Sequence, residues 1–345
     1  MKGFILAAGF GERLRPITDS VPTPLLPVGN IPLIGYALKL LAHHGITEVI
    51  INLHHLGRAI REALGEGADY GVHITYSEEE EILGTGGGLK RMHEQLAEGT
   101  FVVVNSDTIV DVDLGAVIAQ HQRKGALATM VLREDPRQGE FGQIEIDATG
   151  RIRRILGQGN TADGLRPTMF VGVHVLEPRF LEYIPPDVNT CINRYAYMKA
   201  LGNGELLNGY LSTGYFADAG TPARYYDVNA DALDQQWKLP HADPLGGFAL
   251  APRREVAEVV RMGSDVELAP GVTLTPPVLL GEGVRIGEGA KIGPYAVLQA
   301  GVHVGKDARV DHSVLLEGTR IESDEEASWK LVGRKASLAL ATDRK

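Results

Sequence analysis

The 345-residue chain contains very little cysteine and no long apolar run. Cys191 is its single cysteine, so no disulfide can form within the chain, which is typical of a reducing compartment. No stretch of about 18 apolar residues exists, so we expect no transmembrane helix. The opening residues, MKGFILAAGFGER, lack the basic segment and the long apolar core of a signal peptide. We therefore expect a cytoplasmic protein without membrane contact.

Positive charge is also in short supply, because 34 lysines and arginines stand against 44 aspartates and glutamates, which gives a formal net charge of −10. Nucleic acids are bound largely through neutralised phosphates, so this balance argues against a nucleic-acid partner. A small anionic ligand would have to be held by local amides, arginines or a metal ion. The hydrophobic content of 44% and the chain length predict a globular protein of two domains.

The first 237 residues alternate between strand-like and helix-like segments. Short apolar runs at residues 2–8, 48–53, 72–76 and 101–104 predict strands, and helical spacing predicts helices near 32–44, 56–64 and 89–96. Residues 126–175 are rich in strands, which suggests a substrate-facing elaboration, and residues 222–236 predict a closing helix. Such alternation is typical of an α/β protein. We therefore expect a Rossmann-like domain with a mixed sheet over residues 1–237.

A different pattern follows a linker at residues 238–259 that is rich in Pro and Gly. Apolar residues recur every six positions in two columns, the first from Val266 to Val314. The second column contains Leu268, Leu274, Leu280, Ile286, Ile292, Leu298, Val304, Val310 and Leu316. These columns resemble the hexapeptide repeat of left-handed β-helices, in which three hexads make one coil. We expect three coils over residues 260–322 and a cap and tail over 323–345. Open coil ends expose strand edges, so we also expect a homo-oligomer through this domain.

The most informative segment is the glycine loop LAAGFGERLRP, which follows the first strand. Gly9 and Gly11 allow a ligand to approach the backbone N–H groups, and Arg13 can fork onto phosphate oxygens. A dinucleotide-binding loop would have Gly or Ala where Leu14 stands, and a phosphate loop ending in Gly-Lys-Ser/Thr is absent from the sequence. Taken alone, the loop is also compatible with a tight turn beside a surface arginine.

The longer stretch LAAGFGERLRPITDSVPTPLLPVGNIPLI resembles the signature of sugar-1-phosphate nucleotidyltransferases of the mannose-1-phosphate guanylyltransferase type. The resemblance continues through INLHHL, EEEEILGTGGGLK, FVVVNSD and GYFADAGTPARYYDVNADAL, and so covers about the first 235 residues. It implies that Arg13 lies beside the departing pyrophosphate. It also implies a nucleotide-binding set made of Leu6, Ala7, Ala8, Gly9, Gly11, Glu12 and Arg13. A trailing β-helix is a frequent companion in that family.

Two aspartates fall inside the matching motifs. Asp107 ends a buried strand, where open α/β sheets place their sites, and Asp218 precedes a turn that opens a helix. The resemblance implies that both bind Mg²⁺, an ion that favours carboxylate and phosphate oxygens. The metal would neutralise charge as a sugar-phosphate oxygen attacks the α-phosphorus. Aspartates in such places also commonly cap turns and helices.

A second glycine segment, GTGGG at residues 84–88, is expected to form a loop. By the resemblance this loop lies against the base and ribose, which assigns Gly84, Thr85 and Gly86 to the nucleotide. Glu78 precedes the loop, and one carboxylate can accept both adjacent donors on the Watson–Crick edge of guanine. Our hypothesis is that Glu78 reads the base and favours guanine, whereas a run of glutamates is more commonly a solvated face.

The chain departs from the family signature at two positions. Thr23 stands where the family has a lysine that contacts phosphate, and Gln158 stands where a lysine holds the sugar phosphate. Two missing cations in a polyanionic site would lower the rate on the order of 10²-fold or more. Arg194 is the favoured source of a compensating charge, with a plain surface arginine as an alternative of at least equal weight. It joins Thr23, Gln158 and Gly172 in the expected sugar-phosphate site. The other candidates are Arg133, Arg153, Arg154 and Arg166.

Together these patterns predict an enzyme that transfers a nucleoside monophosphate from an NTP, with GTP preferred, to a hexose 1-phosphate such as mannose 1-phosphate. UTP and other sugar phosphates are alternatives. The rival hypothesis, motivated by Thr23 and Gln158, is a regulatory homologue that binds nucleotide but turns over slowly. His54 and His55 are expected to pack at a helix entry. A hexapeptide acyltransferase that uses a solenoid histidine is disfavoured, because three coils offer a small platform.

Overall fold

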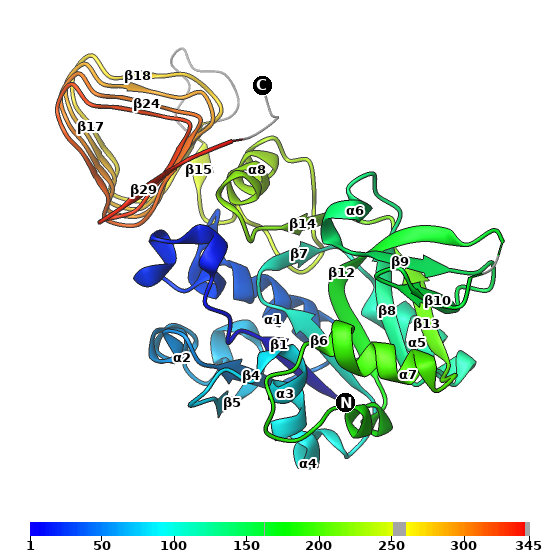
Figure 1. The fold of residues 1–345 in the computed structure, drawn as a ribbon. Helices are drawn as coiled ribbons and strands as arrows, with labels where there is room; N and C mark the ends of the chain where they lie inside the picture. Colours follow the sequence, from blue (N-terminus) through cyan, green and yellow to red (C-terminus); the bar gives the residue numbers. More distant parts are fainter. Residues whose placement is uncertain (162, 251–259, 342–345) are drawn as a thin grey trace. The chain divides into compact units, whose positions relative to one another are not determined.

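The computed structural model describes residues 1–161, 163–250 and 260–341, and the chain forms two compact units (Figure 1). The first unit contains residues 1–10, 22–25 and 33–216, and the second contains residues 11–21, 26–32 and 217–345. The units therefore do not follow the boundary expected near residue 237. The glycine loop is divided between them after Phe10, and the closing helix falls with the C-terminal repeats.

Four parallel strands form one half of the sheet in the first unit. They are β1 (Lys2–Leu6), β4 (Glu48–Leu53), β5 (His73–Glu78) and β6 (Phe101–Asn105), in the order β6-β1-β4-β5. Their nearly continuous apolar sequences suit strands that are covered on both faces. Successive side chains alternate between two cores, so Ile5 and Val104 enter one core while Phe4 and Val103 enter the other.

Helices follow these strands in the order that the alternating pattern predicts. The chain passes from β1 to α1 (Leu33–His43), from β4 to α2 (Gly57–Leu64), and from β5 to α3 (Gly84–Arg91) and α4 (His93–Leu96). α5 (Leu114–Lys124) begins at Asp113, whose side chain accepts a hydrogen bond from Ala116 N, and it ends at Gly125. No helix within residues 1–161, 163–250 and 260–341 is long and apolar enough to cross a membrane.

The strand-rich segment extends the same sheet beyond β6. β12 (Arg166–Leu176) pairs antiparallel with β6, with β8 (Ala128–Arg133) and with β9 (Gln143–Ile146). The remaining strands are β10 (Ile152–Ile155), β11 (Gln158–Gly159) and β13 (Leu207–Leu211). Parallel and antiparallel pairs thus share one sheet, which confirms the predicted mixed α/β class. Short elements complete this unit: β7 (Thr108–Val110), α6 (Gln138–Phe141), a π-helix (Ile192–Tyr197) and α7 (Met198–Gly202).

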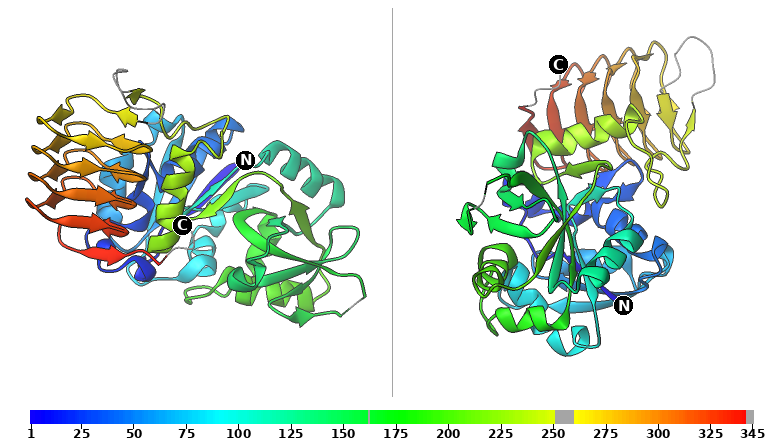
Figure 2. Two further views of the ribbon diagram at one scale, coloured as in Figure 1. Left: turned by 90° about the horizontal axis from the view of Figure 1, so that it is seen from above. Right: turned by 90° about the vertical axis from the view of Figure 1, so that its right-hand side faces the viewer.

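The second unit is built around a solenoid whose stacked coils are seen end-on as a triangle in Figure 1 and from the side in Figure 2. One parallel sheet contains β17 (Glu267–Leu268), β20 (Arg285–Ile286), β23 (His303–Val304) and β26 (Arg320–Ile321). The next contains β18 (Thr273–Leu274), β21 (Lys291–Ile292), β24 (Arg309–Asp311) and β27 (Glu326–Ser328). The third contains β16 (Val260–Met262), β19 (Val278–Leu280), β22 (Ala296–Leu298), β25 (Ser313–Leu315) and β28 (Lys330–Val332). This arrangement confirms the predicted β-helix.

Several shorter elements belong to the second unit or border it. α8 (Pro222–Leu233) begins at Thr221, whose hydroxyl accepts a hydrogen bond from Arg224 N. β14 (Phe216–Asp218) leads into that turn, and β2 (Pro27–Val28) pairs with β3 (Ile31–Pro32). β15 (Ala249–Leu250) and β29 (Ser337–Ala339) each add an antiparallel strand to the third solenoid sheet.

The solenoid differs from the predicted repeat after Val310. Leu298 pairs with Leu280 in the preceding coil and with Leu315 in the following coil. Leu315 therefore occupies the column in which the sequence places Leu316. The physical reason is a corner before β25 that is one residue shorter than the corner before β22. An unbroken six-residue period cannot anticipate such a deletion.

The coils also continue past residue 322, where the sequence analysis ends them. Ile321 and Ala327 are 1% and 0% exposed and extend the buried column, and β27 and β28 pair in parallel with the coil before them. The acidic stretch from Glu322 to Glu326 interrupts the apolar pattern because it forms an outward-facing corner, with Asp324 at a φ of 62°. The prediction that solenoid ends mediate subunit contacts stays a prediction.

A buried histidine joins β12 to the π-helix in the first unit. His174 on β12 is 1% exposed, and its Nδ1 lies 2.8 Å from the hydroxyl of Tyr197. Its ring also contacts Phe170, with centroids 4.2 Å apart. Burial disfavours the charged ring and lowers the pKa of His174 from 6.5 to about 3.

We expect the free energy of unfolding to fall as the pH drops from about 6.5 towards 3. The unfolded chain binds a proton in this range, whereas folded His174 stays neutral until its lowered pKa is reached. The group contributes a slope of at most about 1.4 kcal/mol per pH unit. Denaturant unfolding of the wild type and of His174→Gln, compared between about pH 5.5 and pH 4, should show a shallower slope for the variant. Equal slopes would contradict this assignment.

Candidate active site

The first part of the glycine loop leaves the sheet where the parallel strands end. Leu6, the last residue of β1, pairs with Asn52 on one side and Asn105 on the other. Ala7 and Ala8 are buried, and Ala7 N donates a hydrogen bond of 2.9 Å to Asn52 Oδ1. Gly9 is exposed, with open space where a side chain would stand. The backbone at Gly9 is therefore accessible to an anion.

The second part of the loop belongs to the second unit and contains Gly11, Glu12 and Arg13. Gly11 has a φ of 66°, a left-handed conformation that favours glycine. Its carbonyl accepts hydrogen bonds from Leu14 N at 2.9 Å and from Thr18 Oγ1 at 2.8 Å. These two bonds fix the turn from which the side chain of Arg13 projects.

Asp218 and Arg13 meet at Gly220. Asp218 Oδ1 accepts a hydrogen bond of 2.9 Å from Gly220 N and lies 3.5 Å from Arg224 Nη1. The Arg13 guanidinium lies so close to Gly220 that it would have to shift to make room for a Cβ at this position. The structure thus brings two of the three predicted catalytic side chains together within the second unit. The parts played by Arg224 and Gly220 were not predicted from the sequence.

Asp107 lies in the first unit, in the turn between β6 and β7, and is half-buried. β12 passes close to this turn because Gly172 has no side chain: a Cβ there would lie 2.8 Å from Thr108 Oγ1. In the part of the chain that the structure describes, no three His, Cys, Asp or Glu side chains form a metal-binding group.

The segment expected to be a glycine loop is instead the N-terminal half of helix α3. Gly84 has a φ of 68° and turns the chain into the helix, whereas Gly86 and Gly87 are needed for packing. Gly86 N donates to Thr190 O at 2.7 Å, and a Cβ on Gly87 would lie 2.6 Å from Val188 O. Thr85 Oγ1 accepts a hydrogen bond from Ile192 N. Composition suggested a loop because glycine disfavours helices, but close backbone contacts at residues 188–190 override that propensity here.

A buried hydrogen-bond network beneath α3 was not predicted from the sequence. Asn52, which binds Ala7 N through its oxygen, donates its amide to Glu79 Oε1 at 2.7 Å. Glu79 Oε2 accepts from Leu83 N at 2.8 Å, and Glu79 is 4% exposed. A Cβ on Gly88 would lie 2.7 Å from both Asn52 Nδ2 and Glu79 Oε1. The network therefore joins the ends of β1, β4 and β5 to the start of α3. The one feature of the sequence that could have indicated this network is a polar residue, Asn52, near the end of an apolar strand.

Glu78, the residue assigned to base recognition, is exposed at the end of β5. Its Oε1 accepts a hydrogen bond of 2.6 Å from Arg61 Nη2, whose guanidinium also lies over the Tyr76 ring. His54 and His55 contact the ring of Phe10 in the glycine loop, with centroids 5.2 and 5.7 Å apart. His54 therefore packs as expected, and its Nδ1 also bonds to Glu79 O at 2.8 Å.

The expected sugar-phosphate residues differ in their surroundings. Thr23 is 8% exposed, and its buried hydroxyl has no hydrogen-bond partner within the described residues. Gln158 is exposed in the hairpin of β10 and β11, and Arg194 is exposed on the π-helix. The other candidate arginines are engaged with carboxylates: Arg133 with Asp135, Arg153 with Asp147, Arg154 with Glu145, and Arg166 with Glu134. Arg194 is therefore the favoured source of a compensating charge.

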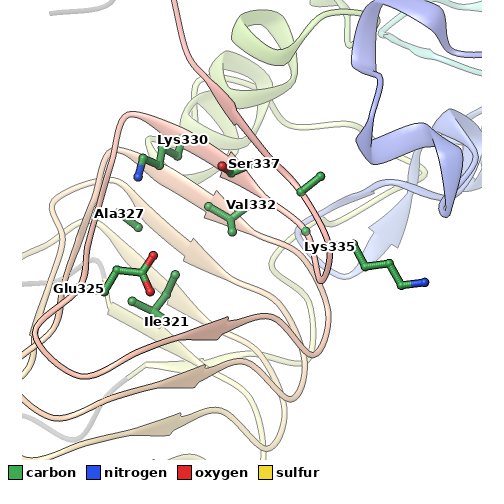
Figure 3. Close-up of a pocket in the computed structure, with 9 residues that line it drawn as sticks. Ile321, Glu325, Ala327, Lys330, Val332, Lys335 and Ser337 are labelled. Carbon is green, nitrogen blue, oxygen red and sulfur yellow. The ribbon is translucent and has the colours of Figure 1, made fainter.

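A cavity of about 260 Å³ opens at the last coil of the solenoid, and Figure 3 shows the side chains that line it. Ile321, Ala327 and Val332 form its apolar part, while Glu325 and Lys330 lie at its edge. None of the residues that line it was predicted to bind substrate. The cavity is thus a feature of the solenoid and lies outside the predicted nucleotide and sugar-phosphate sites.

Comparison with known proteins identifies two families along the chain. Residues 2–235 match the family described as nucleotidyl transferase. Residues 274–340 match the family described as the GMPPB C-terminal domain. The first match spans the mixed sheet, the glycine loop and α8, and the second spans most of the solenoid.

The individual relatives are named for the transfer of different nucleotides. N-acetylmuramate alpha-1-phosphate uridylyltransferase of Neisseria meningitidis is 36% identical over 241 residues, which cover 69% of this chain and 100% of that protein. Mannose-1-phosphate guanylyltransferase of Mycobacterium tuberculosis is 30% identical over 325 residues, covering 92% of this chain and 80% of that protein. A solved structure from Bacillus anthracis, assigned as a glucose-1-phosphate thymidylyltransferase, has a TM-score of 0.59 at 26% identity and covers 67% of this chain and 94% of that one.

We expect Glu79→Ala to lower the free energy of unfolding by about 2–4 kcal/mol, because it leaves the amides of Asn52 and Leu83 without an acceptor in a buried place. Glu80→Ala is the matched control, since Glu80 is the exposed neighbour and should change stability by less than about 0.5 kcal/mol. Denaturant unfolding of the two variants measures the difference. Equal losses from both would show that the network does not stabilise the fold.

Proposed function

We propose that this chain, which belongs to the nucleotidyl transferase family, transfers the guanylyl group of GTP to mannose 1-phosphate and releases pyrophosphate. The chain is a sugar-1-phosphate nucleotidyltransferase. Our proposal concerns the identity of the base, guanine, and of the sugar, mannose. The choice rests on the C-terminal match at residues 274–340 and on the guanylyltransferase relative, whose similarity spans 92% of this chain and includes the solenoid.

The observation that carries the proposed chemistry is the meeting of Arg13 and Asp218 at Gly220. In the reaction, an oxygen of the sugar phosphate attacks the α-phosphorus of the NTP, and the bond from that phosphorus to the pyrophosphate oxygen breaks. Arg13 would bind the pyrophosphate as its negative charge increases. The backbone at Gly9 would approach the triphosphate, as expected for a glycine loop after a strand.

Asp107 and Asp218 would hold a Mg²⁺ ion. Both are carboxylates, the donor type that Mg²⁺ prefers, and the ion would neutralise the phosphates when bound. The contacts of Asp218 to Gly220 N and Arg224 both use Oδ1, so we expect Oδ2 to face the cation.

For the nucleotide and the sugar phosphate, we propose the same contact residues that the sequence predicts. Gly84, Thr85 and Gly86 would lie against the nucleotide, and Glu78 would read the base with its second carboxylate oxygen, because Arg61 holds the first. Thr23, Gln158, Gly172 and Arg194 would bind the sugar phosphate. The hydroxyl of Thr23 has no hydrogen-bond partner within the described residues. Because buried polar groups normally have one, this supports a role for Thr23 in binding a phosphate oxygen.

Two alternatives have their own support. The uridylyltransferase relative is more similar in sequence than the guanylyltransferase over the residues that it matches, which favours UTP as the competing nucleotide. Thr23 and Gln158 favour a homologue that binds nucleotide sugars but turns over slowly. Both alternatives are separated from the main proposal by the same measurement of turnover.

We expect pyrophosphate release to be fastest with GTP, mannose 1-phosphate and Mg²⁺ when the purified full chain is offered each NTP with several sugar 1-phosphates. Asp218→Asn and Asp107→Asn should lower kcat by about 10²-fold or more, because each removes a charge at the proposed metal site. Faster release with UTP would select the uridylyl alternative. Nucleotide binding without release would select the slow homologue.

We expect Thr23→Lys to raise kcat/KM by about 10-fold or more, because a charge-assisted bond to phosphate is roughly twice as strong as a neutral one. Thr23→Met is the matched control, since it has similar length without charge. Thr23 is buried, so unfolding of both variants is measured with and without nucleotide to separate lost stability from lost activity. Equal activity of the two variants would show that charge at this position is not limiting.

A further inference from the structure

The loop that bears Arg13 is part of the same compact unit as the solenoid and α8. We call residues 11–21 the arginine loop. Its start is fixed by Gly11, and Arg13 rests against Gly220, two residues after Asp218. The relative position of Arg13 and Asp218 therefore depends on what supports the arginine loop and what supports the turn before α8.

The arginine loop is supported by the solenoid through Ile17. Ile17 is 3% exposed, and a Cβ on Gly333 would lie only 3.0 Å from its Cδ1 atom. Thr18, the next residue, is fully buried and donates its hydroxyl hydrogen bond to Gly11 O. A contact at Gly333 is thus transmitted through two adjacent side chains to the turn from which Arg13 projects.

The helix that follows Asp218 is supported by three rings that stand one above another at successive solenoid corners. We call Tyr295, His312 and Trp329 the aromatic corner column. His312 stacks on Trp329 with centroids 4.3 Å apart and lies 5.8 Å from Tyr295. Trp329 contacts Tyr226 of α8 at 5.7 Å, and the Tyr295 hydroxyl binds Asp234 just past the end of α8 at 3.1 Å.

The backbone of the aromatic corner column is unusual. Tyr295, His312 and Trp329 have φ values of 52°, 45° and 53°, a conformation in which bulky residues are rare. Glycine would adopt this conformation without strain. Bulky residues that retain it in three successive coils indicate a compensating contact, and their contacts to each other and to α8 supply one.

One strand carries both supports. Trp329 and Gly333 flank β28 (Lys330–Val332), the strand against which the cavity of Figure 3 opens. In that view Lys330 and Val332 lie beside the cavity while Lys335 points away from the coils. A displacement of β28 would therefore act on α8 at one end and on the arginine loop at the other.

We propose that the last coils of the solenoid are part of the catalytic apparatus, with Trp329 and Gly333 as positioning residues that keep Asp218 and Arg13 in register. Trp329 acts through Tyr226 and α8, and Gly333 acts through Ile17 and Thr18. This inference rests on the proposed function, since it takes Arg13 and Asp218 to serve the transfer reaction. Misplacement of reacting groups by about 1 Å can lower a rate on the order of 10²-fold, so a remote support can control kcat.

The first test introduces a tight contact between residues 333 and 17 and then removes it with a second substitution. Gly333→Ala in the full chain places a methyl group against Ile17 Cδ1, and Ile17→Val removes that atom. We expect Gly333→Ala to lower kcat about 10-fold, with KM for both substrates within about threefold of the wild type. The double variant Gly333→Ala with Ile17→Val should recover kcat to within about threefold of Ile17→Val alone. Additive losses in the double variant would overturn the inference.

The second test measures the arginine loop without any turnover. Trp329→Ala and Gly333→Ala should speed hydrogen exchange at Leu14 N and Ser20 N about 10-fold, while amides of β6 stay unchanged. Trp329→Phe keeps a ring at the corner and should behave as the wild type. Ile286→Ala is the control for general weakening, because Ile286 is buried inside an early coil. It should lower the melting temperature without changing exchange in the arginine loop.

The two tests separate the inference from the proposed function. A wild type that releases no pyrophosphate from any NTP and sugar 1-phosphate would defeat the proposed function, and exchange would still decide whether β28 supports the arginine loop. Exchange at residues 11–21 that is the same in Trp329→Ala, Gly333→Ala and the wild type would overturn the inference even if the enzyme is active.

Discussion

The contact between the Arg13 guanidinium and the backbone at Gly220 is the constraint on which the second unit depends. It brings a permanent cation close to the Asp218 carboxylate, which is only 14% exposed and so is partly removed from water before any ligand arrives. The left-handed turn at Gly11 and the Thr18 hydroxyl fix the approach from one side. Asp218 and the cap of α8 fix it from the other. A side chain at residue 220 would displace the Arg13 guanidinium from this position.

In the first unit the constraint is different, because polar groups are buried at the ends of its parallel strands and each needs a hydrogen-bond partner. Asn52 and Glu79 lie where an apolar core would otherwise continue, and their bonds to Ala7 N and Leu83 N satisfy backbone donors that have left the sheet. The glycine loop and α3 are thereby attached to the same carboxylate. Buried hydrogen bonds, rather than long loops, thus fix the segments that are proposed to contact the nucleotide.

Much of this architecture follows from local pattern, and the exceptions have identifiable causes. The strands and the mixed sheet were predicted because burial on both faces gives short continuous apolar runs, and the solenoid was predicted from its six-residue period. The solenoid register after Val310 was wrong because one short corner shifts every later residue, so that Leu315 replaces Leu316. The helix at Gly84 was read as a loop because its glycines serve contacts with residues 188–190, which lie far along the chain.

The candidate site was predictable only where a motif named its residues. Arg13 and Asp218 were chosen by resemblance, and the structure brings them together, while the roles of the chosen residues stay predictions. Glu79 was passed over in favour of Glu78, because four consecutive glutamates give no indication of which one points inward. Gly220 and Trp329 carry no local signal at all. Their importance comes from contacts between segments that only the folded chain brings together.

The contact of Ile17 with Gly333 joins two segments that lie far apart in the sequence and bears on how the protein is made. The ribosome synthesises the arginine loop long before β28, the strand that supports it. Until then the mixed sheet can assemble, because its strands are complete by residue 211. The arginine loop therefore gains this support only after β28 has been synthesised. A nascent chain that stalls within the repeats would hold a formed sheet and an unsupported arginine.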